Sequence, residues 1–255
     1  MSADKHKSKR AAAQRRIAEK RAAEAAARAA AERRRRTIIA GIAGVVLVVI
    51  ALVIVITVQS QRTSTSANAA VPANTVDSGH VIAVGSASAP VTVDLYEDLQ
   101  CPNCKVFEDA SGKTLAQLVA AGTVQAHYHP MAFLDTATNH QYSTRALNAA
   151  AAVVNAGGSA AFQKFHDLLY ANQPPETGSG LSDARLIAYA HQAGATASSV
   201  DSAIKNLTYG DWVKTVTDQA STDGVTQTPT VFVKGKQLTD LSPAGLTAAV
   251  NAAKG

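Results

Sequence analysis

The sequence has little cysteine, and that shortage limits what its thiols can do. Of its 255 residues only two are cysteines, and they stand three positions apart, at Cys101 and Cys104. Two cysteines cannot supply the four ligands of a structural zinc site by themselves. A disulfide between them would close so small a loop that it would stabilise the fold little. The pair therefore points to reactive thiols.

Motifs of several common protein classes are missing as well. The sequence shows no glycine-rich phosphate-binding loop, no Ser–His–Asp pattern and no internal repeat. Residues 10–36 are rich in alanine but have almost no large apolar side chains, so they lack the seam of a coiled coil. The chain is therefore not expected to bind phosphate through such a loop, to use a Ser–His–Asp triad, or to form a coiled coil through residues 10–36.

Acidic residues are scarce at the start of the chain. Residues 1–36 contain 13 Lys or Arg against 4 Asp or Glu, whereas residues 37–255 contain 11 against 15. The positive charge thus belongs to a tail, and a nucleic-acid-binding role for the whole protein does not fit. We interpret the tail as a solvated cytoplasmic helix or a disordered basic arm. The more specific alternative is that the tail binds anionic lipid through its basic residues. Nucleic-acid binding by the tail is the least favoured alternative.

Charge is absent from residues 37–58, an apolar run of 22 residues. About 20 apolar residues suffice to cross a bilayer as a helix, so we expect a single transmembrane helix here. The alternative is a cleaved signal peptide with a small-residue site at 67–69, but such peptides have apolar cores of about 7–15 residues. Arginines at 33–36 precede the run and only Arg62 follows it closely. The positive-inside rule then places the N-terminus in the cytoplasm and the remainder outside the cell membrane.

Residues 59–78, rich in Ser, Thr, Ala and Asn, are typical of a flexible linker. The folded domain is predicted to follow this linker, at residues 79–255, and it is long enough to bury a core without structural disulfides. Alternation and helical periodicity predict strands at 91–96 and 123–129 with a helix at 103–121 between them. A helical block at about 140–220 follows, with helices at about 141–156, 160–171, 182–193, 197–206 and 210–222. A strand from Thr230, a hairpin turn and a second short strand follow. The last predicted helix has Ser242 as its N-cap and Pro243 in its first turn, and it runs to about Ala253.

The position of the cysteines explains their expected reactivity. Cys101 follows a strand and begins a helix, and Pro102 suits the first helical position. Backbone N–H groups at a helix start favour a thiolate there, and in such motifs the thiol pKa falls from about 8.5 to about 3.5–7.5. Cys104 lies one turn further on, where it can resolve a mixed disulfide. The dipeptide Pro102-Asn103 is expected to tune the redox potential.

Two segments carry a resemblance to a known family. Residues 96–105, YEDLQCPNCK, resemble the active-site segment of the DsbA-like thioredoxin superfamily, in its bacterial membrane-anchored branch. Residues 224–235, GVTQTPTVFVKG, are similar to the family's cis-proline loop and the hairpin after it. The resemblance covers about 79–255. It implies an α/β thioredoxin fold with a helical insertion, a cis Pro229, and a Thr228 that faces the cysteines and pairs with substrate backbone.

The sequence departs from the family at one position. Many members have a buried Glu six residues before the first cysteine, as a proton acceptor for the buried thiol, and here that residue is Leu95. Asp94 should point to the opposite face of the strand. Glu97 and Asp98 are alternatives, although solvated acids at the strand end are the simpler interpretation. The group that handles the Cys104 proton therefore stays open.

Histidines offer a further candidate site. His127 and His129 alternate on one strand and share a face, and with Cys101 they could suggest a metal. No third and fourth ligand stands at a suitable spacing, so we expect capping or surface histidines, no metal site and no cofactor. His166 is expected on the polar face of a helix.

The resemblance implies a thiol–disulfide oxidoreductase that acts on thiol-containing exported proteins outside the bacterial membrane. The Cys-Pro-x-Cys dipeptide and the helical insertion favour a disulfide donor, which would need a membrane redox partner as electron acceptor. A reductase or isomerase that uses the same residues is the nearest alternative, because a threonine before the cis-proline, as at Thr228, occurs in oxidase and in reductase or isomerase branches. A non-enzymatic, membrane-anchored binding module is the alternative from another class.

Overall fold

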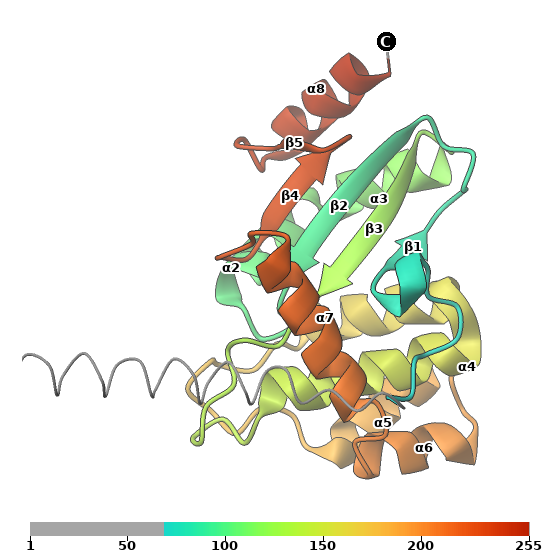
Figure 1. Cartoon of the computed structure of the whole chain (residues 1–255), viewed down its shortest axis with the longest axis vertical. Helices are drawn as coiled ribbons and strands as arrows, with labels where there is room; N and C mark the ends of the chain where they lie inside the picture. The colour runs from blue at the N-terminus through green and yellow to red at the C-terminus, as the bar shows by residue number, and fades with distance from the viewer. Residues whose placement is uncertain (1–68, 255) are drawn as a thin grey trace, which may run out of the picture. The chain divides into compact units, whose positions relative to one another are not determined.

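A computed structural model describes residues 69–254 of the chain, and Figure 1 shows their arrangement. The basic tail predicted at 1–36, the membrane helix predicted at 37–58 and residues 59–68 of the predicted linker lie outside the described residues. Between residues 69 and 254, no helix combines the length and the apolar character that a membrane crossing requires.

A five-stranded sheet in the order β1-β3-β2-β4-β5 lies at the centre of the fold. Its strands are β1 (Ile82–Val84), β2 (Val91–Glu97), β3 (Val124–Pro130), β4 (Thr230–Val233) and β5 (Lys236–Gln237). β2 and β3 pair in parallel, and all other neighbouring strands pair antiparallel. The strands predicted from the sequence are confirmed. β1 has no counterpart among those predictions, because three residues are too short to establish an alternating pattern.

Helices cover both faces of the sheet (Figure 1). On one face α2 (Pro102–Phe107), a π-helical turn (Glu108–Gly112) and α3 (Lys113–Ala120) run on from one another, where the sequence predicts a single helix. α8 (Pro243–Ala253) packs against α3, and its N-cap is Ser242, as predicted, whose hydroxyl accepts from the Gly245 N–H at 3.1 Å. α7 (Gly210–Thr222) crosses the opposite face. The active-site helix and α7 are therefore separated by the sheet.

The predicted helical insertion between β3 and β4 is confirmed. It consists of α4 (Tyr142–Ala171), α5 (Asp183–Gln192), α6 (Ser198–Lys205) and α7. The two helices predicted at 141–156 and 160–171 form one element, α4, which kinks at Gly158, with φ 66° and ψ −166°. Glycine adopts this backbone conformation without the steric cost that a Cβ would add. The kink lets α4 change direction without a separating loop.

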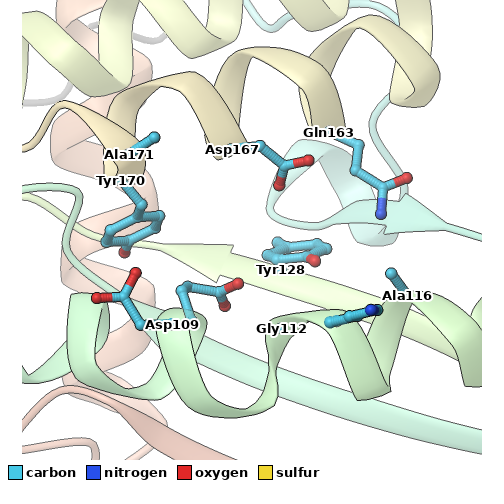
Figure 2. Close-up of a pocket in the computed structure, with 10 residues that line it drawn as sticks. Asp109, Gly112, Ala116, Tyr128, Gln163, Asp167, Tyr170 and Ala171 are labelled. Atoms are coloured by element: carbon cyan, nitrogen blue, oxygen red, sulfur yellow. The ribbon is translucent and has the colours of Figure 1, made fainter.

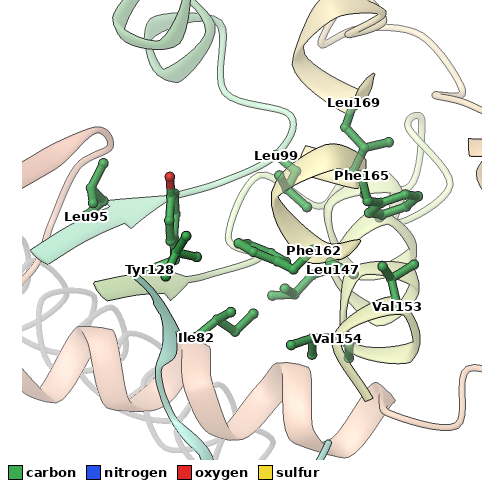
Figure 3. Packing of buried hydrophobic residues seen from close by; sticks show 14 of the residues in the cluster. Ile82, Leu95, Leu99, Tyr128, Leu147, Val153, Val154, Phe162, Phe165 and Leu169 are labelled. Atoms are coloured by element: carbon green, nitrogen blue, oxygen red, sulfur yellow. The ribbon is translucent and has the colours of Figure 1, made fainter. Parts of the chain in front are cut away.

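The second half of α4 closes the core against the sheet. Phe162, Phe165 and Leu169 are at most 1% exposed and belong to the same buried cluster as Leu95 and Tyr128, and Phe162 contacts Tyr128 (Figure 3). Burying each such side chain contributes about 1.5–3 kcal/mol. Six aromatic side chains of the helices are buried: Phe107, Phe162, Phe165, Tyr170, Tyr189 and Trp212.

The fold begins before Gly79, where the sequence places the domain boundary. The side-chain amide of Asn74 donates to the Val154 carbonyl of α4 at 3.0 Å. Trp212 of α7 donates through Nε1 to the Gly79 carbonyl at 2.7 Å. Residues 69–78 therefore belong to the folded unit, although their small polar composition is that of a linker.

Candidate active site

Cys101 stands at the N-terminus of α2, directly after the loop that leaves β2. Its backbone is extended, with φ −69° and ψ 121°, and Pro102 takes the first helical position, as predicted. Both thiols are free, and Cys101 and Cys104 are 6% and 1% exposed. Both cysteines are thus buried, and the first keeps slightly more exposure than the second.

The loop before β4 meets the cysteines from the other side. The Thr228–Pro229 peptide bond is cis, and the Cys101 sulfur lies 3.4 Å from the Thr228 carbonyl oxygen. Pairing of β2 with β4 sets Tyr96 opposite Thr230, so the loops that flank the two strands lie at the same edge of the sheet. Both features that the resemblance implied for this loop, the cis bond and the facing Thr228, are confirmed.

Hydrogen-bond donors converge on the Cys101 sulfur. They lower its pKa from 9.0 to about 5, and the largest cause is a hydrogen bond from the Cys104 thiol. Burial opposes the shift, while the Thr228 side chain and the backbone N–H groups of Cys104 and Asn103 reinforce it. The Thr228 hydroxyl is buried and has no hydrogen-bond partner of ordinary geometry among the described residues, so its proton is free to turn toward the sulfur. Cys101 is therefore a thiolate at neutral pH, the form that attacks disulfides.

Cys104 has the opposite environment. Burial raises the pKa of its thiol far above the ordinary value, and the hydrogen bond to Cys101 and the negative charge of Glu97 raise it further. The two sulfurs therefore differ in protonation at neutral pH. Cys101 is the ionised, outer sulfur and Cys104 the protonated, inner one.

Asp98 fixes the loop between β2 and Cys101. It is fully buried, and its Oδ1 accepts from the Gln100 N–H at 2.8 Å and the Ser143 hydroxyl at 2.7 Å. Its Oδ2 accepts from the N–H groups of Phe133 and Leu134 at 3.0 and 3.2 Å. Burial raises the pKa of Asp98 to about 6, and these hydrogen bonds limit the rise. The expectation of a solvated acid is wrong, because the start of α4 covers this loop.

An apolar groove of about 480 Å³ lies beside Asn103 and the cis-proline loop. Val106, which is 66% exposed, and Phe107 contribute its α2 side, and Leu241 closes it from the segment before α8. Exposed apolar surface next to a reactive group is typical of a binding site. The groove is therefore formed by α2 and by the loops before β4 and before α8.

Comparison with known proteins fits this geometry. The family model described as Thioredoxin matches residues 77–252. The disulfide bond oxidoreductase DsbG from Mycobacterium tuberculosis is 34% identical with a TM-score of 0.63, and the match covers 69% of this chain and 88% of DsbG. DsbA from the same organism is 32% identical with a TM-score of 0.60, and the match covers 69% and 98%. The chain belongs to the DsbA-like thiol–disulfide oxidoreductases.

Curated relatives of this DsbA-like enzyme share a shorter segment with it. The serine/threonine-protein kinase PknE from Mycobacterium tuberculosis is 32% identical over 116 residues, which are 44% of this chain and 20% of the kinase. The chain therefore spans about a fifth of the length of the curated relatives it matches. Its family is shown by the family model and by the two solved structures.

This DsbA-like enzyme has Leu95 in place of the strand acid and buries Glu97 instead. Glu97 is 2% exposed, its Oε1 lies 2.8 Å from His166 Nε2, and the Tyr170 hydroxyl donates to its Oε2 at 3.3 Å. Because Glu97 follows Leu95 by two residues on β2, it points to the same face, toward Cys104. The expectations of a solvated Glu97 and a polar-face His166 are wrong, because α4 packs over this end of the sheet.

Glu108 of the π-helical turn adds a second acid to this cluster. One ligand atom from each of Glu97, Glu108 and His166 lies within 4.8 Å of the other two. Burial raises the pKa of Glu108 to about 7, and its Oε1 has no hydrogen-bond partner among the described residues. Glu108 also lines a cavity of about 380 Å³, together with Tyr128 and Tyr170 (Figure 2). A carboxyl that titrates near neutral pH thus lies between the buried acid beside Cys104 and an open cavity.

Proposed function

We propose that this enzyme donates disulfides to exported proteins outside the bacterial membrane. The observation that carries the proposal is the thiolate at Cys101, whose pKa is about 5. Whatever stabilises the reduced form of a dithiol makes its disulfide a stronger oxidant. At pH 7 a pKa of about 5 stabilises the thiolate over the thiol by about 2.7 kcal/mol, which shifts a two-electron potential by roughly 60 mV.

The proposed reaction has two exchange steps. A substrate thiolate attacks the Cys101 sulfur of the oxidised enzyme, the Cys101–Cys104 bond breaks, and Cys104 leaves as a thiolate. Cys104 then takes up a proton, because the pKa of its thiol is far above neutral. A second substrate thiolate attacks the substrate sulfur of the mixed disulfide and releases Cys101 as the stable thiolate. The substrate leaves with a disulfide and the enzyme is left reduced.

We infer that the acid cluster supplies the proton that Cys104 takes up. Glu97 is the acid whose charge acts on the Cys104 thiol, and the buried His166 and the half-buried Glu108 are its neighbours. Glu108, with a pKa of about 7, exchanges protons with the adjoining cavity at neutral pH. Protonation of Cys104 prevents it from attacking back on the mixed disulfide, so it favours the forward direction.

The substrate is proposed to bind along the cis-proline loop. Thr228 and Pro229 line the apolar groove together with Asn103 and Val106, next to the reactive sulfur. An extended segment that carries a cysteine would pair its backbone with this loop and place apolar side chains in the groove. Within the active-site motif, Pro102 and Asn103 tune the potential through the start of α2.

The cellular location is also a proposal. The 22-residue apolar run at 37–58 and the arginines before it support a single-pass membrane anchor with a cytoplasmic N-terminus and an extracytoplasmic catalytic domain. An enzyme that donates disulfides must be reoxidised after each cycle. A membrane redox partner would accept its electrons.

The deciding experiment is the reduction potential of the Cys101–Cys104 pair in the full-length chain, held in detergent and equilibrated against glutathione. A value near −120 mV, at the strongly oxidising end of the scale, would support disulfide donation. A value near −270 mV would replace the proposal with a reductase on the same residues. If the chain exchanges no disulfide, and a Cys101→Ala variant keeps its cellular phenotype, the binding-module alternative is preferred.

A further inference from the structure

Three side chains gather on the face of the sheet that α7 crosses. Asp94 of β2 and His127 and His129 of β3 point to this face, on which Tyr96 hydrogen-bonds Asp223 at the end of α7. The parallel register sets Asp94 opposite His127 and Tyr96 opposite His129. The three side chains are 24%, 24% and 15% exposed, so the cluster is half-buried and open to solvent.

The spacing of their polar atoms suits a metal ion. Asp94 Oδ1 lies 3.1 Å from His129 Nε2 and 3.4 Å from His127 Nδ1, and one ligand atom from each residue lies within 4.8 Å of the other two. Tetrahedral Zn²⁺ with bonds of about 2.0–2.2 Å has ligand–ligand separations of about 3.3–3.6 Å. The two oxygen–nitrogen separations are already close to that range.

The imidazole rings are held in place by further contacts. His127 Nε2 lies 3.0 Å from the side-chain oxygen of Gln125, and His129 stacks on Tyr96 with a centroid separation of 4.3 Å. If His127 donates its Nε2–H to Gln125, its Nδ1 is left unprotonated and turned toward Asp94. Metal-binding histidines usually donate their other ring N–H to such an acceptor, which fixes the tautomer. Gln125 is thus a positioning residue.

We propose that Asp94, His127 and His129 form a binding site for a divalent transition-metal ion such as Zn²⁺, with a fourth position open to water. Two imidazoles and one carboxylate are a ligand set that such ions prefer, and three protein ligands leave one position free. Asp223, which accepts a hydrogen bond from the Tyr96 hydroxyl at 2.9 Å, adds a negative charge to this face and favours a cation. The site is independent of the dithiol and lies beyond the proposed disulfide chemistry.

The test uses the full-length chain with its cysteines oxidised, so that thiolates cannot hold the metal. Zn²⁺ affinity is measured by competition with a chromogenic chelator. We expect one Zn²⁺ per chain, and binding weaker by at least about 100-fold in Asp94→Asn. Replacing the positioning residue in Gln125→Leu should weaken binding by about 10–100-fold.

His191→Asn is the matched control. His191 Nε2 lies 2.7 Å from Asp201 Oδ1, a His–Asp pair as close as those of the proposed site, but no third ligand groups with it among residues 69–254. Its removal should leave the affinity unchanged. Equal Zn²⁺ affinity in the wild type and in Asp94→Asn would overturn the proposal, as would Zn²⁺ binding that requires the reduced cysteines.

A second measurement covers the case in which a substitution disturbs the fold. Melting curves in EDTA report whether each variant is folded without metal. The d–d absorption of Co²⁺ added to the oxidised wild-type chain then tests for the proposed metal site without any substitution. Intense bands of a four-coordinate ion support the site, and the weak spectrum of hydrated Co²⁺ rules it out.

Discussion

At the scale of single residues, the Thr228 hydroxyl and the Glu97 carboxylate act on different sulfurs. The hydroxyl lies beside Cys101 and lowers the pKa of that thiol, whereas the carboxylate raises the pKa of Cys104. The loop of one and the strand of the other are separated by about 130 residues of chain, and the β2–β4 pairing brings them to the same edge. The effect of the Thr228 hydroxyl and that of the Glu97 carboxylate can therefore be tested separately, each by a single substitution.

Thr228→Val should raise the pKa of Cys101. A hydrogen bond to a charged group contributes about 1.5–3 kcal/mol, so its loss corresponds to a rise of about 1–2 pH units. The potential should become less oxidising by roughly 30 mV for each unit. Thiolate absorbance of the reduced chain as a function of pH measures the first change. Thr215→Val on α7 is the control, and an unchanged pKa in Thr228→Val would show that the remaining donors suffice.

Glu97→Gln should slow disulfide exchange while leaving the pKa of Cys101 near its wild-type value. Loss of a positioned general acid–base group, through which the proton passes to Cys104, typically reduces a rate by about 10²–10⁴-fold. Single-turnover oxidation of a dithiol peptide by the oxidised chain measures the rate. The exposed acid of α7 provides the control, Asp211→Asn. If Glu97→Gln exchanges disulfides as fast as the wild type, Cys104 takes its proton from another group.

The sequence predicted the reactive cysteines and the loop that faces them, but it did not predict which buried acid lies beside Cys104. A cysteine after a strand and before a helix is visible in the sequence, and so is the proline of the facing loop. The burial of Glu97 is not visible there, because it depends on the path of α4, more than 40 residues later. The third ligand beside His127 and His129 was missed for a related reason. Asp94 is their neighbour through strand register, which spacing along the chain does not reveal.

At the scale of elements, the kink of α4 decides which side chains reach the sheet. Phe162, Phe165 and His166 follow the kink at Gly158 and are all buried. Periodicity predicted both halves of α4 but separated them with a break, because two adjacent glycines usually end a helix. The spacing of Phe162, His166 and Tyr170 by four residues marks the buried stripe in retrospect.

Gly158→Ala should lower the free energy of unfolding by about 1–3 kcal/mol, because an alanine is strained at this backbone conformation. Urea denaturation followed by circular dichroism measures the loss. Gly210→Ala is the matched control, since that glycine has no positive φ and a Cβ there would meet only Leu207 Cβ at an ordinary 3.8 Å. Equal stability of the two variants would mean that α4 relaxes at the kink.

The π-helical turn makes stability depend on pH through Glu108. The folded-state pKa of about 7 exceeds the ordinary value of 4.5, so the folded chain binds this proton more tightly than the unfolded chain. The stabilisation is complete below pH 4.5 and is lost as pH rises through about 7. Glu108→Gln should remove this loss, so its stability relative to wild type should increase between pH 5 and pH 8. A difference that is constant over this range would contradict the assignment.

At the scale of the whole molecule, the described residues belong to one compact unit, and the anchor is predicted to precede it, at residues 37–58. The full-length chain should sediment with membranes, and a chain that begins at residue 69 should remain in the supernatant. Protease added to intact spheroplasts should degrade the catalytic domain of the full-length protein, because residues after the apolar run are predicted to lie outside. Protection of that domain until the membrane is lysed would reverse the proposed orientation.

The position of the two cysteines has a consequence for how a new copy of the protein matures. A chain with one pair of thiols, three residues apart, has a single possible internal disulfide and no way to form a wrong one. Its core is built from apolar side chains of the sheet and of α4, which pack without any covalent bridge. If the enzyme is exported as proposed, a new copy can therefore reach its native state before any other disulfide catalyst has acted on it. Such an enzyme can then form disulfides in other proteins of the same compartment before any other disulfide catalyst is active there.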